Sequence, residues 1–331
     1  MENSQIVAGQ TPFRPRRFLR GGHLQTLGGF LLPRRLAVPP SERRLIEVEK
    51  GVCVLCHCHW QSARQSALTV IILHGLEGSS ESDYSVGIAQ KGLALGMNVV
   101  RMNQRNCGGT DDLAPTLYNS GLSGDVRAVA QNLIERDGIS RFALAGYSMG
   151  GNLVLKAAGE WGRQGPPEFR AVAAVCPAMD LAASADALHS LANRLYEIYF
   201  MRKLRRRLEA KARLFPAHFD PARLRGVKTL REFDDKITAH YCGYAGADDY
   251  YARAAAANVV HRIAVPALIL HAANDPFIRI LPETRKKLLD NPNITFVESQ
   301  DGGHCSFLAA RDGYDGYWAE RQIVEFFKRF N

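Results

Sequence analysis

Apolar stretches alternate along the chain with amphipathic stretches that have helical spacing. The apolar runs include "ALTVIILHG", "MNVVRMNQ", "FALAGYS" and "AVAAVCPAM", and the helical ones include "GLSGDVRAVAQNLIERDG" and "NLVLKAAGEW". Short runs that are apolar on both faces are typical of buried strands, and the helices between them would cover both faces of a parallel sheet. The pattern therefore predicts an α/β fold with a mostly parallel central sheet.

The alternation stops between residues 180 and 262 and resumes with "PALILHAAND", "ITFVES" and the terminal helix "GYWAERQIVEFFKRF". The intervening segment has no clear buried strand and is mostly helical, charged and aromatic. We expect one α/β domain over residues 45–331, into which residues 180–262 are inserted as a helical cap. We expect residues 1–44 to form a basic arm that packs on this core. A chain of 331 residues is long enough for this arrangement.

The composition is that of an ordinary globular protein, with 46% hydrophobic and 23% charged residues. No stretch reaches the roughly 18 apolar residues of a spanning helix. The first residues, "MENSQIVAGQTPFRPRRFLRGG", lack the apolar block and cleavage site of a signal peptide. The seven cysteines are odd in number and scattered, which argues against a disulfide framework. These features predict a cytoplasmic protein with reduced thiols.

One cluster suggests a metal site, "VCVLCHCHW", which contains Cys53, Cys56, His57, Cys58 and His59. Its flanks predict β structure, and side chains alternate along a strand, so Cys56 and Cys58 would face away from the other three. A His-x-His pair on a strand can bind zinc, but a third ligand would have to come from a distant part of the chain. We therefore expect ordinary strand residues here, and neither a metal nor a cofactor.

The net charge of +9 raises the question of nucleic acid or an anionic membrane as a partner. Basic residues gather at 14–20, at 34–44 and in "MRKLRRRLEAKARLF". They lack the interleaved aromatic residues of a single-strand binder and any DNA-reading motif, so we expect no nucleic acid as a partner. If the last stretch is helical, Leu204, Leu208 and Ala212 share one face. It would then be a solvated lid helix, or alternatively a surface for peripheral contact with anionic lipid.

Gly146, Ser148 and Gly150 in "LAGYSMGGN" form the pattern G-x-S-x-G between a predicted strand and a predicted helix. This is the setting of a nucleophilic serine on a sharp turn, where a side chain at either glycine would collide with the neighbouring elements. A phosphate-binding or merely tight turn is the alternative. The agreement of strand, turn and helix favours Ser148 as a nucleophile.

A serine nucleophile needs a base and a group that orients the base. In this architecture the partners follow in the order Ser, acid, His. Asp275 ends the strand "LILHAAND", and His304 lies in "ESQDGGHCSF" after the last strand. Asp301 is a weaker alternative for the acid, because it lies only three residues from the histidine. His74 and His271 lie in or next to strands, which favours structural roles for them.

The oxyanion of an acyl-transfer intermediate requires backbone N–H groups. We expect one from Met149, directly after the nucleophile, and one from Leu76 in the loop after "VIILHG". The inserted segment offers apolar and aromatic side chains that could form the wall of an acyl pocket, namely Leu195, Tyr196, Tyr199, Phe200, Tyr241 and Tyr244.

Several longer motifs resemble the AB hydrolase type 4 family of α/β-hydrolases. They are "GGHLQTL", "HGLEGSSESDY", "NQRNCGGTDDLAPTLYNSGLSGD", "GYSMGGN", "FDDKITA", "GYAGADDYYARA", "DPF" and "GGHCSF". The family includes bacterial YheT-type esterases, mammalian abhydrolase-domain phospholipases and yeast medium-chain ethyl ester synthases. The resemblance covers nearly the whole chain and implies an α/β-hydrolase fold with a triad on Ser148, Asp275 and His304.

This sequence departs from the family pattern at three positions. Asn106 replaces a usual glycine and can tolerate a positive φ. Asn274 replaces a common aspartate, and His240 stands where proline is frequent. We expect no counterpart of the membrane anchor of the mammalian relatives, and we therefore expect their lipid substrates to transfer poorly to this chain.

We expect a serine carboxylesterase that hydrolyses short- to medium-chain acyl esters, its substrate a small-molecule or lipid-like ester. The alternatives are an acyltransferase that passes the acyl group to an alcohol and a hydrolase fold retained as a non-catalytic binding scaffold. Because a base must be neutral to accept a proton, activity is expected to rise through about pH 6 to 7. The segments "GGHLQTL" and "SGLSGD" receive no chemical role; the first could dock the arm and the second could cap a helix through Ser123 or Asp125. The sequence leaves the oligomeric state open.

Overall fold

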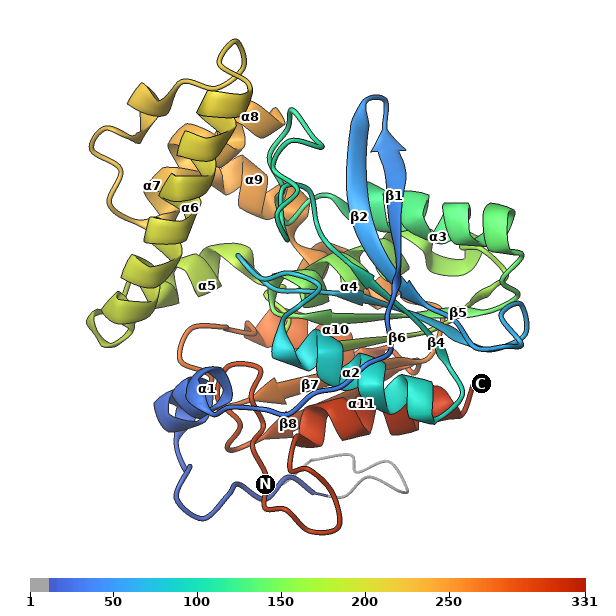
Figure 1. Cartoon of the computed structure of the whole chain (residues 1–331). Coiled ribbons are helices and arrows are strands. Elements are labelled where there is room, and N and C mark those ends of the chain that lie inside the picture. The colour runs from blue at the N-terminus through green and yellow to red at the C-terminus, as the bar shows by residue number, and fades with distance from the viewer. Residues whose placement is uncertain (1–11) are drawn as a thin grey trace.

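An eight-stranded sheet forms the centre of the protein in a computed structural model that describes residues 12–331 (Figure 1). The strand order is β1-β2-β4-β3-β5-β6-β7-β8. β1 and β2 form an antiparallel hairpin, β2 pairs antiparallel with β4, and all other neighbours are parallel. The strands are β1 (Glu42–Glu49), β2 (Val52–His59), β3 (Thr69–Leu73), β4 (Asn98–Met102), β5 (Phe142–Tyr147), β6 (Phe169–Val175), β7 (Ala267–Ala272) and β8 (Ile294–Ser299).

Helices cover both faces of the sheet, as the apolar pattern predicts. Along β3, Ile71 and Leu73 pack on one face and Val70 and Ile72 on the other, because successive side chains of a strand point to opposite sides. The first face is covered by α3 (Ser123–Asp137), α4 (Met149–Trp161) and α10 (Pro282–Asp290), and the second by α2 (Asp83–Ala94) and α11 (Trp318–Lys328). The predicted α/β-hydrolase architecture is therefore confirmed.

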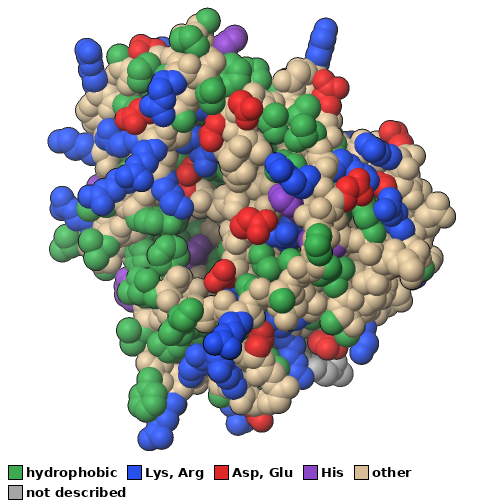
Figure 2. Space-filling view, viewed as in Figure 1, with side chains coloured by type: hydrophobic (Ala, Val, Ile, Leu, Met, Phe, Trp, Pro, Cys, Tyr) green, Lys and Arg blue, Asp and Glu red, His purple; other side chains and the backbone are tan. Residues whose placement is uncertain are grey.

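The segment between β6 and β7 forms a helical cap beside the carboxyl end of the sheet, and the surface between cap and sheet is hollowed (Figures 1 and 2). The cap has its own apolar core, which includes Leu208, Phe219 and Phe233. Its α- and π-helices are α5 (Leu181–Leu188), α6 (Arg194–Leu214), α7 (Leu230–Phe233), a π-helix (Asp234–Ala239), α8 (His240–Cys242) and α9 (Ala247–Ala254). The cap contains no strand.

The basic helix α6 differs from the solvated lid helix that its sequence suggests. Lys203, Arg207 and Lys211 follow one another at intervals of four residues and lie on one face. They bond to loops of the sheet domain: Lys203 Nζ to the Glu77 carbonyl, Arg207 to the Asn106 carbonyl, and Lys211 Nζ to carbonyls of the loop at residues 111–114. Backbone carbonyls and the carboxylates of Glu77 and Asp111, rather than water, bond to this part of the positive charge.

The N-terminal arm packs on the sheet domain through α1 (Gly22–Leu31), the helix formed by "GGHLQTL". The buried Gln25 side chain accepts from the Leu308 N–H and donates to the Leu308 carbonyl, as a neighbouring strand would. Farther along, Arg34 forms a buried bidentate pair with Glu320. β1 begins at Glu42, just before the expected domain boundary, and the part of the arm over residues 1–11 lies outside the described residues.

The cysteine- and histidine-rich strand β2 has the alternation that its sequence predicts. Cys56 and Cys58 are buried in the core, and burial raises the pKa of both thiols. His57 bonds to Ser41, and burial lowers the pKa of His59 to about 4. Among the described residues, no group of three potential metal ligands includes a side chain of β2. None of the helices in that part of the chain combines the length and the hydrophobicity of a membrane span.

Two expectations about loops and caps have different outcomes. Asn106 has a φ of 64°, as expected for asparagine in place of glycine. The prediction that "SGLSGD" caps a helix is wrong, because α3 begins after Leu122 without a side-chain cap. Ser123 instead donates to Glu160, and Asp125 forms a buried bidentate pair with Arg105.

Candidate active site

Ser148 lies on the turn between β5 and α4, at the carboxyl edge of the sheet. Its φ of 54° and ψ of −118° are strained for a residue with a side chain. The Ser148 N–H donates to the Val175 carbonyl at 2.9 Å, and α4 begins at the next residue. Strained backbone of this kind is typical of a nucleophile raised above a sheet.

The glycines around Ser148 are required by close backbone approach. A Cβ on Gly146 would lie 2.3 Å from the Gly150 carbonyl oxygen, and a Cβ on Gly150 would lie 2.4 Å from the His74 carbonyl oxygen. A Cβ on Gly75 would lie 3.1 Å from the Ser148 Cβ. The first two distances are shorter than van der Waals contact, so the turn can form in this position only with glycine.

Gly150→Ala is therefore expected to destabilise the protein by roughly 1–3 kcal/mol or more, because backbone atoms must move to admit the methyl group. Gly124→Ala is a matched control, since a Cβ on this residue of α3 meets nothing within 4 Å. Alanine is a better helix former than glycine, so the control is expected to be neutral or stabilising. Urea unfolding of both variants measures the difference, and equal stability would contradict this account of the turn.

Asp275 and His304 form a buried pair beside this turn. His304 Nδ1 donates to Asp275 Oδ2 at 2.8 Å, while Asp275 Oδ1 accepts from the N–H groups of Phe277 and Ile278. This bond orients the ring, so that Nδ1 faces the carboxylate and Nε2 can accept a proton. Among the described residues, no hydrogen bond joins Nε2 to Ser148 Oγ, a bond that is often long in unliganded sites.

A single carbonyl connects the serine turn with the histidine loop. The Val175 oxygen accepts from the Ser148 N–H and lies 3.6 Å from the Sγ of Cys305, the residue after His304. The three sequence-predicted residues Ser148, Asp275 and His304 thus gather at the carboxyl ends of β5, β7 and β8, which follow one another with β6 in the sheet order.

The charge state of His304 depends on its acidic neighbours. Burial raises the pKa of the Cys305 thiol, but Cys176 and His304 lower it by more, to about 6, so that Cys305 is present as a thiolate. Burial lowers the pKa of His304, but the Cys305 thiolate and the Asp275 carboxylate raise it by a larger amount. Burial raises the pKa of Asp275, but His304 lowers it by a larger amount, so the carboxyl group stays ionised. Cys305 Sγ lies 3.7 Å from His304 Nε2, close enough for this interaction.

The alternative acid and base candidates have other partners. Asp301 Oδ1 accepts from the Gly21 N–H and from Asn274 Nδ2, and so connects the arm with the loop that carries Asp275. His74 is buried with a pKa lowered by burial to about 4, and it accepts from the Gln104 N–H. Burial also lowers the pKa of His271, which lies within β7.

The loop after β3 leaves one N–H free beside the serine. The Gly75 N–H donates to Tyr84 Oη, the Glu77 N–H to Tyr118 Oη and the Gly78 N–H to the Gly75 carbonyl. In the described part of the chain, the Leu76 N–H makes no such bond, and Leu76 lines the same cavity as Ser148. Met149 is the first residue of α4, where N–H groups have no partner within the helix. Both expected oxyanion donors are thus available.

The residues that hold this loop were not predicted from the sequence. Glu77 has a φ of 56° and forms a bidentate pair with Arg207 of α6, with nitrogen–oxygen distances of 2.7 and 3.0 Å. Tyr118 Oη donates to the same carboxylate at 2.7 Å. The only signal in the sequence was the four-residue spacing of the basic residues on α6, which predicts a shared face but not the loop that this face contacts.

Two other residues whose role was not predicted from the sequence hold the His304 loop. Thr26 Oγ1 of α1 accepts from the His304 N–H at 2.8 Å. Asn274 Oδ1 accepts from the Gly303 N–H, so this residue joins the loops of the acid and the base. The motif "GGHLQTL", which was predicted only to dock the arm, therefore also supports the backbone of His304.

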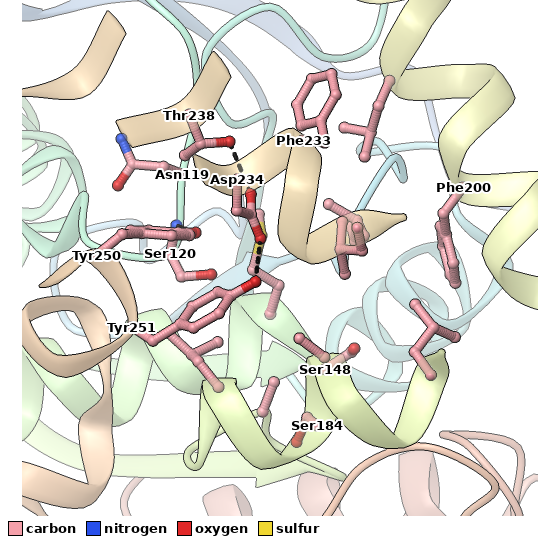
Figure 3. Close-up of a pocket in the computed structure, with 18 of the residues that line it drawn as sticks. Asn119, Ser120, Ser148, Ser184, Phe200, Phe233, Asp234, Thr238, Tyr250 and Tyr251 are labelled. Carbon is pink, nitrogen blue, oxygen red and sulfur yellow. Dashed lines mark hydrogen bonds between the residues drawn. The ribbon is translucent and has the colours of Figure 1, made fainter. Parts of the chain in front are cut away.

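A largely apolar cavity of about 110 Å³ lies between Ser148 and the cap (Figure 3). Figure 3 shows Phe200 on the opposite side from Asp234, Tyr250 and Tyr251. Asp234, whose pKa burial raises to about 6, accepts from Thr238 and Tyr251. The apolar lining includes Leu76, Ala185, Leu188, Leu204, Leu208, Leu230, Phe233, Phe277 and Ile278.

Of the aromatic residues expected in the pocket, Phe200 lines this cavity and the others lie elsewhere. Tyr196 stacks on His23, and Tyr199 contacts Phe30, so both face α1. Tyr241 Oη accepts from the Asp220 N–H, and Tyr244 Oη donates to Asn119. Leu195 is 82% exposed. Helical spacing indicates which residues share a face but not which neighbour that face meets.

Cys176, His304 and Cys305 place potential metal ligands within 4.8 Å of one another. However, Cys305 Sγ is nearly equidistant from the two ring nitrogens, at 3.7 Å from Nε2 and 3.9 Å from Nδ1. A metal ion bound to Nε2 would lie in the plane of the ring, on the side away from Nδ1. A thiolate bound to that metal would then lie much farther from Nδ1 than from Nε2. The arrangement therefore fits a thiol against the ring and does not fit a tetrahedral metal site.

Comparison with known proteins places this geometry in a family. The model of the alpha/beta hydrolase fold matches residues 69–310. The predicted esterase YheT of Escherichia coli (strain K12) is 30% identical over 95% of this chain and 92% of its own length. The medium-chain fatty acid ethyl ester synthase/esterase 2 of Saccharomyces cerevisiae is 27% identical over 79% of this chain, which spans 62% of that protein.

Among solved structures, the Pyrococcus furiosus esterase Pf2001 superposes with a TM-score of 0.57 at 16% identity, covering 90% of this chain and 98% of that one. This likeness concerns the fold. The serine turn, the buried Asp–His pair and the extent of the match with YheT lead to one conclusion. The chain belongs to the α/β-hydrolase family and, within it, to the esterase and lipase relatives of YheT.

Proposed function

We propose that the protein is a serine carboxylesterase for short- to medium-chain acyl esters. The observation that carries the proposal is the position of Ser148, on a strained turn at the floor of an apolar cavity, beside the buried Asp275–His304 pair. The names of YheT and of the yeast ethyl ester synthase/esterase support an ester as the substrate.

The reaction proceeds through an acyl-enzyme. Ser148 Oγ attacks the acyl carbon while His304 Nε2 takes the serine proton, and Asp275 stabilises the imidazolium that forms. The N–H groups of Leu76 and Met149 donate to the oxyanion. His304 returns the proton to the leaving alcohol, and water activated by the same base then releases the acid.

The cavity limits the length of the acyl chain. At roughly 10–15 Å³ for each water-sized group, a volume of about 110 Å³ accommodates roughly seven to eleven such groups. Each buried methylene contributes about 0.8 kcal/mol, or close to a fourfold gain in kcat/KM. We expect kcat/KM to rise from acetate to esters of roughly six to eight carbons and then to level off or fall. A decline from acetate upward would contradict an acyl site in this cavity.

Ala185→Leu tests which cavity holds the chain, because Ala185 of α5 lines it and leucine adds three carbons there. The optimum is expected to shift to esters about two to three carbons shorter. Ala183→Leu on the same helix is the matched control, since Ala183 is not among the lining residues. Kinetics across the same ester series measures both variants, and identical optima would place the acyl chain elsewhere.

The side chains around His304 are expected to move the rise of kcat/KM with pH to values above pH 6 to 7. The Cys305 thiolate and the Asp275 carboxylate stabilise the protonated ring, so its pKa exceeds the ordinary 6.5 and the neutral base forms only at higher pH. Cys305→Ala removes one negative charge and is expected to shift the rise in kcat/KM to lower pH. Cys242→Ala, in the cap, is the control. Profiles from about pH 5 to 10 measure the shift; an unchanged midpoint would exclude a role for the thiolate.

Transfer of the acyl group to an alcohol is the second candidate, and the name of the yeast ethyl ester synthase/esterase favours it. Water and alcohol would compete for the same acyl-enzyme, so both products share one acyl preference. Free acid and new ester are measured together in the presence of a short alcohol. Ester formation that dominates at low alcohol concentration would favour the acyltransferase over the hydrolase.

A further inference from the structure

The exposed large hydrophobic side chains of the described residues are concentrated on two helical segments. Eight of the thirteen lie in residues 24–31 and 191–199. Several are almost fully in water, including Leu31 (68% exposed), Leu191 (85%) and Leu195 (82%). Single exposed leucines are common, but a group of this size on one face indicates an interaction site.

The two segments form one continuous surface, here named the α1–α6 patch, which consists of the exposed apolar side chains of residues 24–31 and 191–199. The Phe30 and Tyr199 rings contact at a centroid distance of 5.7 Å. The His23 and Tyr196 rings stack, and His23 Nδ1 lies 3.2 Å from Tyr196 Oη. Figure 1 shows α1 beside the lower end of α6.

The charge on the two segments that form the α1–α6 patch is almost entirely positive. Residues 12–35 contain six arginines and no acidic residue. Residues 191–208 contain six basic residues and one acid, Glu197, which is buried and bonded to His189. Figure 2 shows Lys and Arg side chains bordering the hydrophobic groups on this side of the molecule. The exposed basic residues of the two segments are Arg14, Arg17, Arg20, Arg35, Arg194, Arg202 and Arg206.

The α1–α6 patch adjoins the candidate active site. The ring centroids of Tyr196 and Phe277 lie 5.4 Å apart, and those of Phe277 and His304 lie 4.3 Å apart. The ring centroid of Tyr199 lies 5.4 Å from that of Phe200, and Phe200 lines the cavity. A body that covers the α1–α6 patch would therefore lie beside the candidate active site.

We propose that the α1–α6 patch docks the protein on the surface of an anionic lipid bilayer. Exposed Leu and Phe side chains with arginines around them fit the boundary between acyl chains and negatively charged headgroups. A bilayer is favoured over a protein partner because the apolar groups project from two helices and the charge is of one sign. The contact uses arginines other than the inward-facing basic residues of α6. Docking does not depend on the proposed reaction, whereas delivery of a lipid-like ester to the cavity rests on it.

Sedimentation with vesicles tests the docking on the full chain carrying Ser148→Ala, so that hydrolysis cannot alter the lipid. We expect co-sedimentation with vesicles of phosphatidylcholine containing phosphatidylglycerol, and little with phosphatidylcholine alone. Leu31→Ser combined with Leu191→Ser is expected to weaken binding about tenfold or more. Leu45→Ser combined with Leu289→Ser is the matched control, because both leucines are exposed on other elements.

Several results would overturn the proposal. They are equal binding to neutral vesicles, absence of binding to anionic vesicles, and binding that the patch variant leaves unchanged. If the α1–α6 patch instead joins two copies of the chain, light scattering would give a doubled mass that the patch variant halves. In the active protein, the patch variant is expected to keep its activity on a water-soluble ester and to lose activity on an ester embedded in anionic vesicles.

Discussion

Replacement of Ser148 by alanine is expected to lower kcat for ester hydrolysis by roughly 10⁶-fold, if the serine protease template applies. The reason is that no acyl-enzyme can form without the hydroxyl group, while alanine can take up the same φ of 54° at no greater cost than serine. Steady-state kinetics on a soluble ester measures the loss, and circular dichroism and thermal unfolding establish that the fold is retained.

Ser184→Ala is the matched control for this variant. Ser184 lines the same cavity, but its hydroxyl accepts from the Arg279 N–H and lies on α5, away from the turn. Its removal is expected to change kcat/KM by less than about tenfold. Substantial residual hydrolysis by Ser148→Ala, or an equal loss in both variants, would contradict the role of Ser148.

Asp275→Asn is expected to lower kcat by about 10⁴-fold with little effect on stability. Because the N–H groups of Phe277 and Ile278 donate to Oδ1, the asparagine must place its carbonyl oxygen there. Its NH₂ group then faces His304 Nδ1, which becomes an acceptor, so the ring proton moves to Nε2. A base that carries its proton on Nε2 cannot accept one from serine.

Asp301→Asn is the control for the acid, because Asp301 bonds to the same region without contacting the His304 ring. It is expected to retain most of the activity. Turnover that is near normal in Asp275→Asn and lost in Asp301→Asn would transfer the orienting role to Asp301. The assay is kcat on a soluble ester at a pH where His304 is neutral.

The sheet and the serine turn could be predicted from the sequence because the signals are local. A run such as "FALAGYS" is buried on both faces and has only one place in an α/β fold. Gly146 and Gly150 lie within four residues of each other, and the collision that excludes a side chain involves immediate neighbours. Asp275 and His304 follow strands whose order in the fold is fixed by the architecture.

The cap and the supports of the site could not be predicted, because they depend on contacts between distant segments. Glu77 and Arg207 are 130 residues apart, and Thr26 and His304 are 278 apart. Helical spacing groups Lys203 with Arg207, but whether that face meets water or a loop is decided by how the cap packs. For the same reason, Tyr196 and Tyr199 were expected in the pocket and face α1 instead.

Labelling with a fluorophosphonate tests the central claim most directly, since this reagent reacts with an activated serine hydroxyl. The protein is incubated with the probe, digested, and mapped by mass spectrometry. The account predicts one label, on Ser148, that an excess of a medium-chain ester slows and that Ser148→Ala and Asp275→Asn abolish or greatly reduce. Label on another residue, such as Ser184, or an unlabelled protein with full esterase activity, would contradict it.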